Sequence, residues 1–235
     1  MHMATKQKGK RHVDGVPPLM NGDRLKQPEF HRRYEAYPED TKFELVGGTV
    51  YMASPLRVEH SGYDGKLGLV LQLYEVATPG VGALHHATTI LDEDSEPQPD
   101  GGLYILPEFG GQARINERRY IEGAPELLAE VAHSSVALDL HAKRDDYERT
   151  GVLEYLVVCV EERELRWFDF RGRGMIRPNR QGVLKSQVFP GLWIHEQALL
   201  ALDGPRLVEV VQQGLASRAH AAFVKRLAAN RRSQP

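Results

Sequence analysis

The most informative pattern in the chain is a short apolar run, PELLAEVA at residues 125–132, with the carboxylate Glu130 near its end. A continuous apolar run without alternation is typical of a strand that is covered on both faces. In an extended chain Glu130 shares one face with Leu128 and Ala132, and the residues between them face the other way. A carboxylate buried there needs a hydrogen-bonded partner, a metal ion or a proton. The run therefore predicts a central strand with a candidate site at Glu130.

The segments before this run predict a hairpin, two helices and further strands. The sequence FELVGGTVYMA at residues 43–53 indicates two strands around Gly-Gly, which supplies the positive φ of a tight turn. Residues 58–77 place apolar side chains at helical spacing, which predicts an amphipathic helix behind the hairpin. A short helix is expected at residues 29–37, and strands are expected at residues 82–91 and 99–106.

The segments after the run predict more of the sheet and then helices. A helix is expected at residues 136–150, where Gly151 can end it in the left-handed conformation. Two strands are expected at residues 154–160 and 164–170, and helical segments at residues 196–202, 205–213 and 218–229. This order predicts an α/β fold, with a mixed β-sheet flanked by helices and a C-terminal helical tail.

Composition narrows the class of protein. The 235 residues suffice for one substantial core, and 41% hydrophobic with 26% charged residues excludes wholesale disorder. The single cysteine, Cys159, excludes an internal disulfide framework and a thiolate-rich zinc site. No apolar run is long enough to span a bilayer and no signal-peptide core is visible, so we expect a cytoplasmic protein without membrane contact.

Charge is unevenly distributed along the chain. Residues 1–33 carry a net charge of +5 and residues 216–235 also carry +5, whereas the whole chain carries −2. Basic ends on an acidic body can contact a polyanion, although solvated tails explain them as simply. We expect a flexible basic segment at residues 1–28, a domain at residues 29–202 and a helical extension at residues 203–235.

A second carboxylate is a candidate partner for Glu130. Asp100 follows Pro99 at the start of an expected strand, after the acidic loop of residues 92–98. Two carboxylates from neighbouring strands suit an oxygen-liganded cation such as Mg²⁺ or Mn²⁺. Their spacing of thirty residues is not specific, and an Asp after Pro can simply cap a turn.

A helix face follows the central strand. Asp139, Lys143 and Tyr147 are four residues apart and therefore lie on one helix face. Lys143 could place an ammonium beside the metal ion, although the charge run HAKRDD around it is equally typical of a solvated face. We expect Asp139 to orient Lys143, and Tyr147 to pack beside the site. A metal-bound water with a nearby cation is what phosphodiester hydrolysis needs.

An ordered set of short motifs resembles one known family. FELVGG, QPD, LLAEVAHSS, D-x3-K-x3-Y, GVLEYLVV and FPGLW occur in this order within residues 29–202. Together they resemble Uma2, a large bacterial family grouped with restriction endonucleases and similar to a branch of the PD-(D/E)xK nuclease superfamily. The resemblance implies a restriction-endonuclease-like core.

The resemblance also implies roles for individual residues. The metal ligands of the family would be Asp100 and Glu130 here, and its helical lysine would be Lys143. Glu44 matches a Glu in the N-terminal hairpin motif, where it is either a site carboxylate or half of a cross-strand pair. His60 matches a His at the first long helix.

Ala132 stands where the superfamily usually has its lysine, whereas the family has a lysine on the following helix. The chain departs from the family pattern at two places. His133-Ser134-Ser135 replaces Ser-Pro-Ser after the Glu. Gly101-Gly102 replaces an apolar residue after the PD motif and is expected to loosen that strand.

The expected function is a Mg²⁺- or Mn²⁺-dependent endonuclease that hydrolyses phosphodiester bonds in DNA, with a metal-bound water as the nucleophile. One alternative is an inactive nuclease-fold module that binds DNA or a protein partner. Another is a metal hydrolase acting on a small phosphate ester. We expect DNA contacts, mainly to phosphates, at the basic ends and at Arg114, Arg118 and Arg119. We also expect a homodimer, because cutting both strands of a duplex needs two sites.

A pair of histidines, His85-His86, is a weaker candidate. Neighbouring residues of a strand point to opposite faces, so the pair is not expected to bind one ligand together.

Overall fold

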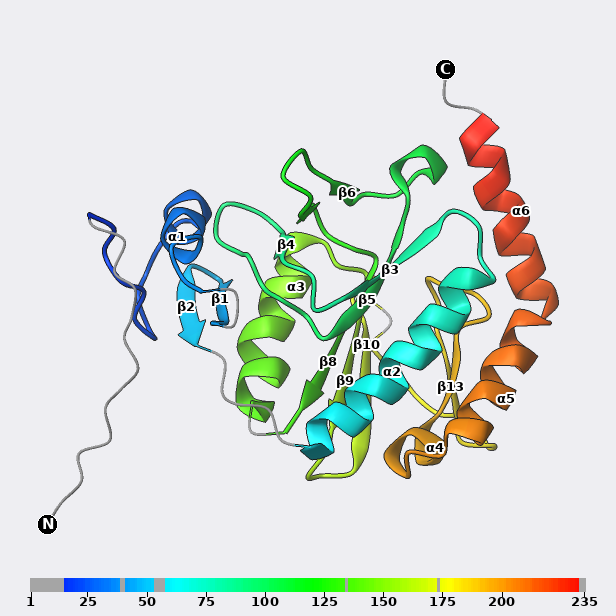
Figure 1. The fold of residues 1–235 in the computed structure, drawn as a ribbon. Helices are drawn as coiled ribbons and strands as arrows, with labels where there is room; N and C mark the ends of the chain where they lie inside the picture. The colour runs from blue at the N-terminus through cyan, green and yellow to red at the C-terminus, as the bar shows by residue number, and fades with distance from the viewer. Residues whose placement is uncertain (1–14, 39–40, 53–57, 134, 173, 233–235) are drawn as a thin grey trace, which may run out of the picture.

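The apolar run at residues 125–132 contains the strand β8 (Leu127–Ala132), and all six of its residues are buried. The computed structural model describes residues 15–38, 41–52, 58–133, 135–172 and 174–232 (Figure 1). β8 pairs in parallel with β9 (Glu154–Cys159) and in antiparallel with β5 (Gly101–Ile105). The central strand predicted from the apolar run is therefore confirmed.

Six strands form the main sheet, in the order β11-β10-β9-β8-β5-β3. Its other members are β3 (Val81–His85), β10 (Glu164–Asp169) and β11 (Gly174–Ile176). Four of its five pairings are antiparallel and one is parallel, so the sheet is mixed, as expected. Shorter strands pair outside it: β4 (Thr89–Ile90), β6 (Arg114–Ile115), β7 (Ile121–Glu122), β12 (Val183–Lys185) and β13 (Trp193–His195).

The two faces of the sheet carry separate cores. Leu127, Ala129 and Val131 pack with the helix α2 (Val58–Val76) and with the C-terminal helices. Leu128 and Ala132 pack on the opposite face with a cluster that includes Tyr147 and Tyr155. Glu130 shares this second face, because side chains alternate along a strand.

Helices cover both faces and extend past one edge. α2 lies on the main sheet and contacts β3, β5 and β8, so it is not behind the hairpin as the sequence suggested. The tail contains α4 (Glu196–Leu200), α5 (Gly204–Leu215) and α6 (Arg218–Arg232), of which α5 packs on α2. No helix in the described ranges has the length and apolar content to cross a membrane.

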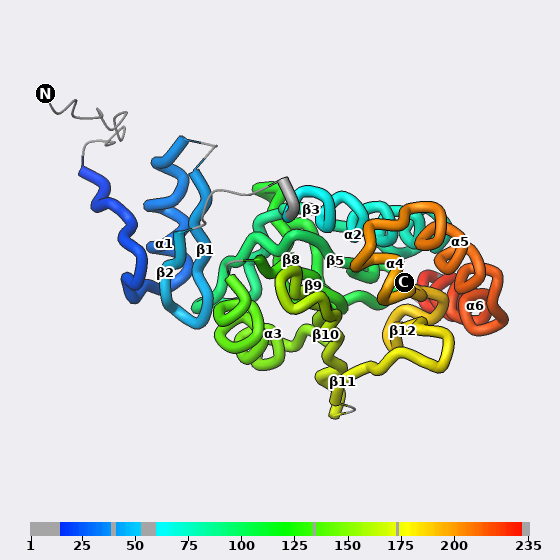
Figure 2. Tube along the Cα trace, turned by 90° about the horizontal axis from the view of Figure 1, so that it is seen from below, coloured from blue at the N-terminus to red at the C-terminus, as the bar shows by residue number. Residues whose placement is uncertain are grey.

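An N-terminal unit lies at the opposite end of the molecule from α5 and α6 (Figure 2). β1 (Phe43–Val46) and β2 (Thr49–Met52) form the predicted hairpin, with Gly47 and Gly48 at φ of +54° and +75°. α1 (Gln27–Tyr34) packs on β1. The part of the expected flexible segment that the structure describes is attached to this unit, since Leu19 is buried with its core.

The predicted helix after β8 begins in an unusual way. Its first part is a π-helix, Leu138–Lys143, which continues directly into α3 (Arg144–Thr150). Short π-helical turns are rare and occur frequently at functional sites. The π-helix buries Asp139 and Lys143 against the sheet. α3 ends at Gly151 with φ of +97°, the left-handed cap expected from the sequence.

Two matched glycine substitutions should shift stability in opposite directions. Gly151→Ala places a Cβ in the left-handed region and should lower the free energy of unfolding by about 1–2 kcal/mol. Gly65→Ala, inside α2, meets no atom within 4 Å and should raise it by about 0.5–1 kcal/mol. Urea unfolding midpoints of the two variants and the parent check both signs, and a shift in the same direction for both would contradict this account.

Candidate active site

The carboxylate of Glu130 is buried on the α3 side of β8. Its Oε1 accepts hydrogen bonds from Lys143 Nζ and from the Tyr147 hydroxyl, each at 2.9 Å. Glu130 and Lys143 are each only 4% exposed. Lys143 stands at the end of the π-helix and Tyr147 four residues later on α3, so one helix face supplies both donors. The charge run HAKRDD is therefore not simply a solvated face.

The ammonium of Lys143 also contacts two further carboxylates. Lys143 Nζ lies 3.0 Å from Glu44 Oε2 and 3.6 Å from Asp139 Oδ1. Glu44 comes from β1, and its other oxygen accepts the backbone N–H of Gln98 at 2.8 Å. Glu44 therefore faces Lys143 and joins the N-terminal unit to the centre of the molecule.

Burial and mutual interaction shift the pKa values of this cluster. Burial raises the pKa of Glu130 well above its usual range; the attraction of Lys143 opposes this shift, and the neighbouring carboxylates add to it. Burial also raises the pKa of Asp139. Burial alone would lower the pKa of Lys143, but attraction to Glu130 and Glu44 outweighs it and raises that pKa well above its usual range. We take Lys143 as charged because three carboxylates surround it.

Asp100 lies immediately before β5, opposite Glu130. Gly101 pairs with Ala129 in the antiparallel register of β5 and β8, and one further step along both strands brings Asp100 to Glu130. Asp100 Oδ2 accepts the backbone N–H of Val131 at 2.7 Å. The carboxylate is thus fixed against β8 beside Glu130, and it is more than a turn cap.

Two histidines contact Asp100 from the other side. His60 Nε2 lies 3.4 Å from Asp100 Oδ2, and His86 Nδ1 lies 3.5 Å from Asp100 Oδ1. Interaction with Asp100, opposed by burial, raises the pKa of His60. The Nδ1 atom of His60 is buried and has no hydrogen-bond partner among the described residues. His60 therefore lies beside Asp100.

The two glycines after Asp100 allow β5 to pack closely against its neighbours. A Cβ on Gly102 would lie 2.6 Å from the carbonyl oxygen of Leu127, and one on Gly101 would lie 2.9 Å from Leu71 Cδ1. Gly101-Gly102 lets β5 approach β8 and α2 closely, so it does not loosen the strand.

The buried cluster carries more negative than positive groups. Three carboxylates, Glu44, Glu130 and Asp139, surround the single ammonium of Lys143, and Asp100 adds its field to Glu130. An excess of buried carboxylates is stable only with bound protons or an added cation. Carboxylate oxygens are donors that suit Mg²⁺ or Mn²⁺, but no three of these four carboxylates bring oxygens within 4.8 Å of one another.

A different group has the tighter arrangement of metal-binding atoms. Asp64, His85 and His86 each place one ligand atom within 4.8 Å of the other two. Among the described residues, no other three His, Cys, Asp or Glu side chains meet this distance. The sequence pattern gave no signal for Asp64. The expectation that the two histidines point to opposite faces was wrong, because both rings contact Asp64 and His86 lies beyond the end of β3 with φ of +50°. A strand-like alternation does not apply to it.

The three arginines expected at DNA lie near β6 and β7. Arg114 Nη2 is 2.7 Å from Glu122 Oε1, and Arg118 Nη1 is 3.2 Å from Glu35 Oε1. Both arginine side chains remain about two-thirds exposed, at 66% and 65%. Arg119 occupies the turn between the two strands, with φ of +70°. All three are accessible, but two of them already have acidic partners.

The family profile named Uma2, described as putative restriction endonuclease, matches residues 28–202. The chain belongs to the Uma2 family. Among solved structures, it is similar to a crystal structure described as a putative nuclease belonging to DUF820, from Anabaena variabilis. That match has 13% sequence identity and a TM-score of 0.58, and it covers 73% of this chain and 97% of the other. No curated protein matches the chain.

Membership in Uma2 confirms the resemblance seen in the motif order, and the structural match confirms the restriction-endonuclease-like α/β fold. The family assignment supports a nuclease at the general level. At 13% identity the structural neighbour bears on the fold alone.

The contact between Lys143 and Glu130 can be measured by a double-mutant cycle. Lys143→Met leaves the buried Glu130 and Asp139 and the partly buried Glu44 without their cation, and it should cost about 3–5 kcal/mol of unfolding free energy. Adding Glu130→Gln should recover part of this loss, with a coupling of about 0.5–3 kcal/mol. Urea unfolding of the parent, both single variants and the double variant gives the coupling.

The matched control for this cycle pairs Lys143→Met with Glu148→Gln, because Glu148 is exposed on α3. Its coupling should be close to zero. Equal coupling in the two cycles would mean that the effect comes from general charge and not from the buried contact.

Proposed function

We propose that this Uma2 protein is a Mg²⁺- or Mn²⁺-dependent endonuclease that hydrolyses phosphodiester bonds in DNA. The observation that carries the proposal is the buried ammonium of Lys143, 2.9 Å from Glu130, beside the strand end that holds Asp100. This chain has Ala132 at the position on the central strand where the superfamily usually has a lysine. Lys143 supplies an ammonium at Glu130 from the π-helix instead.

In this proposal Asp100 and Glu130 hold the cation. Both hydrogen bonds from Lys143 and Tyr147 end on Oε1 of Glu130, so Oε2 is the oxygen assigned to the ion. When bound, the ion supplies an activated water and offsets negative charge on the scissile phosphate. Glu44 and Asp139 act through Lys143, whose position and charge they maintain.

The other residues have supporting tasks. Lys143 keeps its proton and stabilises the additional negative charge that develops on the phosphate. Tyr147 fixes the orientation of Glu130 through its hydroxyl. His60 holds Asp100 from the α2 side, and its raised pKa favours a second positive group near the phosphate.

A non-catalytic module is the second candidate. It is favoured by the same contacts, because Lys143 is already engaged by Glu130 and Glu44, as in a purely structural ion-pair network. Such a module would retain DNA or a protein partner without cutting. Hydrolysis of a small phosphate ester is a third outcome that the same assays distinguish.

The proposal includes DNA as substrate, phosphate contacts by Arg114, Arg118 and Arg119, a homodimer that cuts both strands, and a cytoplasmic location. The support for DNA is the family assignment, and the support for the arginines is their exposure.

Substitution of the two proposed ligands should remove both ion binding and cleavage. Asp100→Asn and Glu130→Gln keep the shape of each side chain but remove its charge. In calorimetric titration with Mn²⁺ each variant should bind at least about tenfold more weakly than the parent, a loss of about 1.4 kcal/mol or more. Nicking of supercoiled plasmid with Mg²⁺ should fall by at least about 100-fold.

Matched controls for these substitutions are Asp145→Asn and Glu148→Gln, which change exposed carboxylates on α3. Both controls should retain ion binding and nicking. Mn²⁺ affinity equal in the parent and in Asp100→Asn would refute the assignment. Salt-sensitive DNA retention without nicking would favour the binding module, and turnover of bis(p-nitrophenyl) phosphate without nicking would favour the small-ester hydrolase.

The arginines near β6 should contribute to DNA affinity by binding phosphates. Changing Arg114, Arg118 and Arg119 to Ala together should weaken binding equally for unrelated sequences. It should also reduce the slope of log affinity against log salt by about one for each phosphate that the variant no longer neutralises. Fluorescence anisotropy over a salt series measures the slope, with Arg206→Ala on α5 as the control. An unchanged slope in the triple variant would place the DNA elsewhere.

A further inference from the structure

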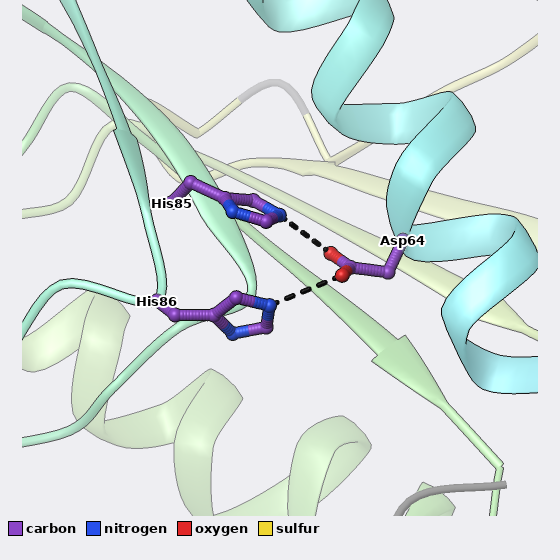
Figure 3. Close-up of side chains that lie close together, drawn as sticks. All are labelled: Asp64, His85 and His86. Carbon is purple, nitrogen blue, oxygen red and sulfur yellow. Dashed lines mark hydrogen bonds and ion pairs between the residues drawn. The ribbon is translucent and has the colours of Figure 1, made fainter.

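A compact group of three side chains lies on the α2 side of Asp100. Asp64 extends from α2, His85 is the last residue of β3, and His86 follows it (Figure 3). His85 Nε2 lies 3.0 Å from Asp64 Oδ1, and His86 Nε2 lies 3.1 Å from Asp64 Oδ2. All three ligand atoms are within 4.8 Å of one another. Two imidazoles and one carboxylate thus converge on one point.

The backbone explains how neighbouring histidines reach the same carboxylate. His86 has φ of +50°, in the left-handed region that non-glycine residues adopt only when the surrounding structure requires it. This turn directs His86 toward α2 together with His85, and the two rings lie 4.2 Å apart between centroids. The uncommon backbone conformation of His86 therefore occurs where the two imidazoles converge on Asp64.

The ring of His85 lies over α2 at Gly68. A Cβ on Gly68 would lie 3.6 Å from His85 Nε2, which is ordinary van der Waals contact. The imidazole therefore packs against the helix that carries Asp64.

We propose that Asp64, His85 and His86 bind a divalent transition-metal ion of the Zn²⁺ class. Imidazole nitrogen favours Zn²⁺, Co²⁺ and Ni²⁺ over Mg²⁺, which prefers oxygen ligands. Three protein ligands leave one position of a tetrahedral ion for water or substrate. The side chain of His85 is 48% exposed and that of His86 is 26% exposed, so an ion can enter from solvent.

A carboxylate behind His86 completes the arrangement. His86 Nε2 faces Asp64, and its Nδ1 lies 3.5 Å from Asp100 Oδ1. Histidines that bind a metal usually donate their other N–H to such a carboxylate, which fixes the tautomer and strengthens the ligand. Asp100 can be this carboxylate for His86, because it lies on the Nδ1 side of the ring.

Carboxylates lie at both nitrogens of His86, Asp64 at Nε2 and Asp100 at Nδ1. The alternative to a bound cation is a set of polar contacts between the two histidines and Asp64 alone, and metal titration distinguishes the two arrangements.

This site is separate from the carboxylate cluster proposed for Mg²⁺. Its ligands come from α2 and the end of β3, whereas Glu130 and Lys143 come from β8 and the π-helix. Asp100 lies between the two groups and links them through His86. Zn²⁺ binding at Asp64, His85 and His86 therefore does not depend on nuclease activity, and its test does not measure cleavage.

The test is calorimetric titration of the full chain with Zn²⁺, after removal of bound metal by a chelator. The parent should bind one Zn²⁺ at this site. His85→Ala and Asp64→Asn should each weaken that binding by at least about tenfold, since loss of even an outer partner costs 10–100-fold. Titration with Co²⁺ should give visible absorption bands of a tetrahedral, nitrogen-containing site in the parent, and weakened or absent bands in both variants.

Two controls locate the ion. His141→Ala removes an exposed imidazole from the π-helix and should leave Zn²⁺ affinity unchanged. Glu130→Gln removes a ligand of the proposed Mg²⁺ site and should also leave it unchanged. His85→Gln, a milder change at a half-exposed position, should reproduce the loss, and circular dichroism of each metal-free variant verifies folding.

Two outcomes would overturn the proposal. Equal Zn²⁺ affinity in the parent and in folded His85→Ala and Asp64→Asn would mean that the histidine pair is an ion-pair network only. Loss of Zn²⁺ binding in Glu130→Gln with retention in His85→Ala would place the ion at the carboxylate cluster. Failure of the nuclease proposal has a different signature, because it concerns Mn²⁺ binding and nicking in Asp100→Asn and Glu130→Gln.

Discussion

The buried ammonium of Lys143 is the interaction on which the centre of the molecule depends. Glu130 from β8, Glu44 from β1 and Asp139 from the π-helix all reach the same nitrogen. Each carboxylate alone would be costly to bury, and each is tolerable because the cation is shared. The N-terminal unit, the main sheet and the helix after β8 are therefore joined by one charge.

This arrangement also places a lysine at Glu130 although the central strand itself carries none. Ala132 is buried among apolar side chains on the same face as Glu130, and a lysine there would compete with the packing of Tyr147 and Tyr155. The π-helix closes each hydrogen bond over one more residue than an α-helix does, and Lys143 at its end lies on Glu130. The ammonium group therefore comes from the π-helix and contacts the carboxylate of Glu130 directly.

Asp100 joins the central strand to two histidines. Its carboxylate accepts the backbone N–H of Val131 on β8, and His60 and His86 contact it from the α2 side. Asp100 therefore lies between the cluster around Glu130 and the pair of histidines at the end of β3.

Local sequence was sufficient to predict most helices and strands and to single out Glu130 and Lys143, which are in contact in the structure. The apolar run of β8, the Gly-Gly hairpin and the cap at Gly151 followed from local periodicity and backbone preference, and the motif order led to the family. The position of α2, the π-helix and the partners of Glu44 could not be predicted, because they depend on which surfaces pack together. The convergence of Asp64, His85 and His86 likewise arises only in the folded chain. A left-handed residue at the end of β3 overrides the alternation that a strand pattern assumes, and α2 brings Asp64 from a distant part of the chain.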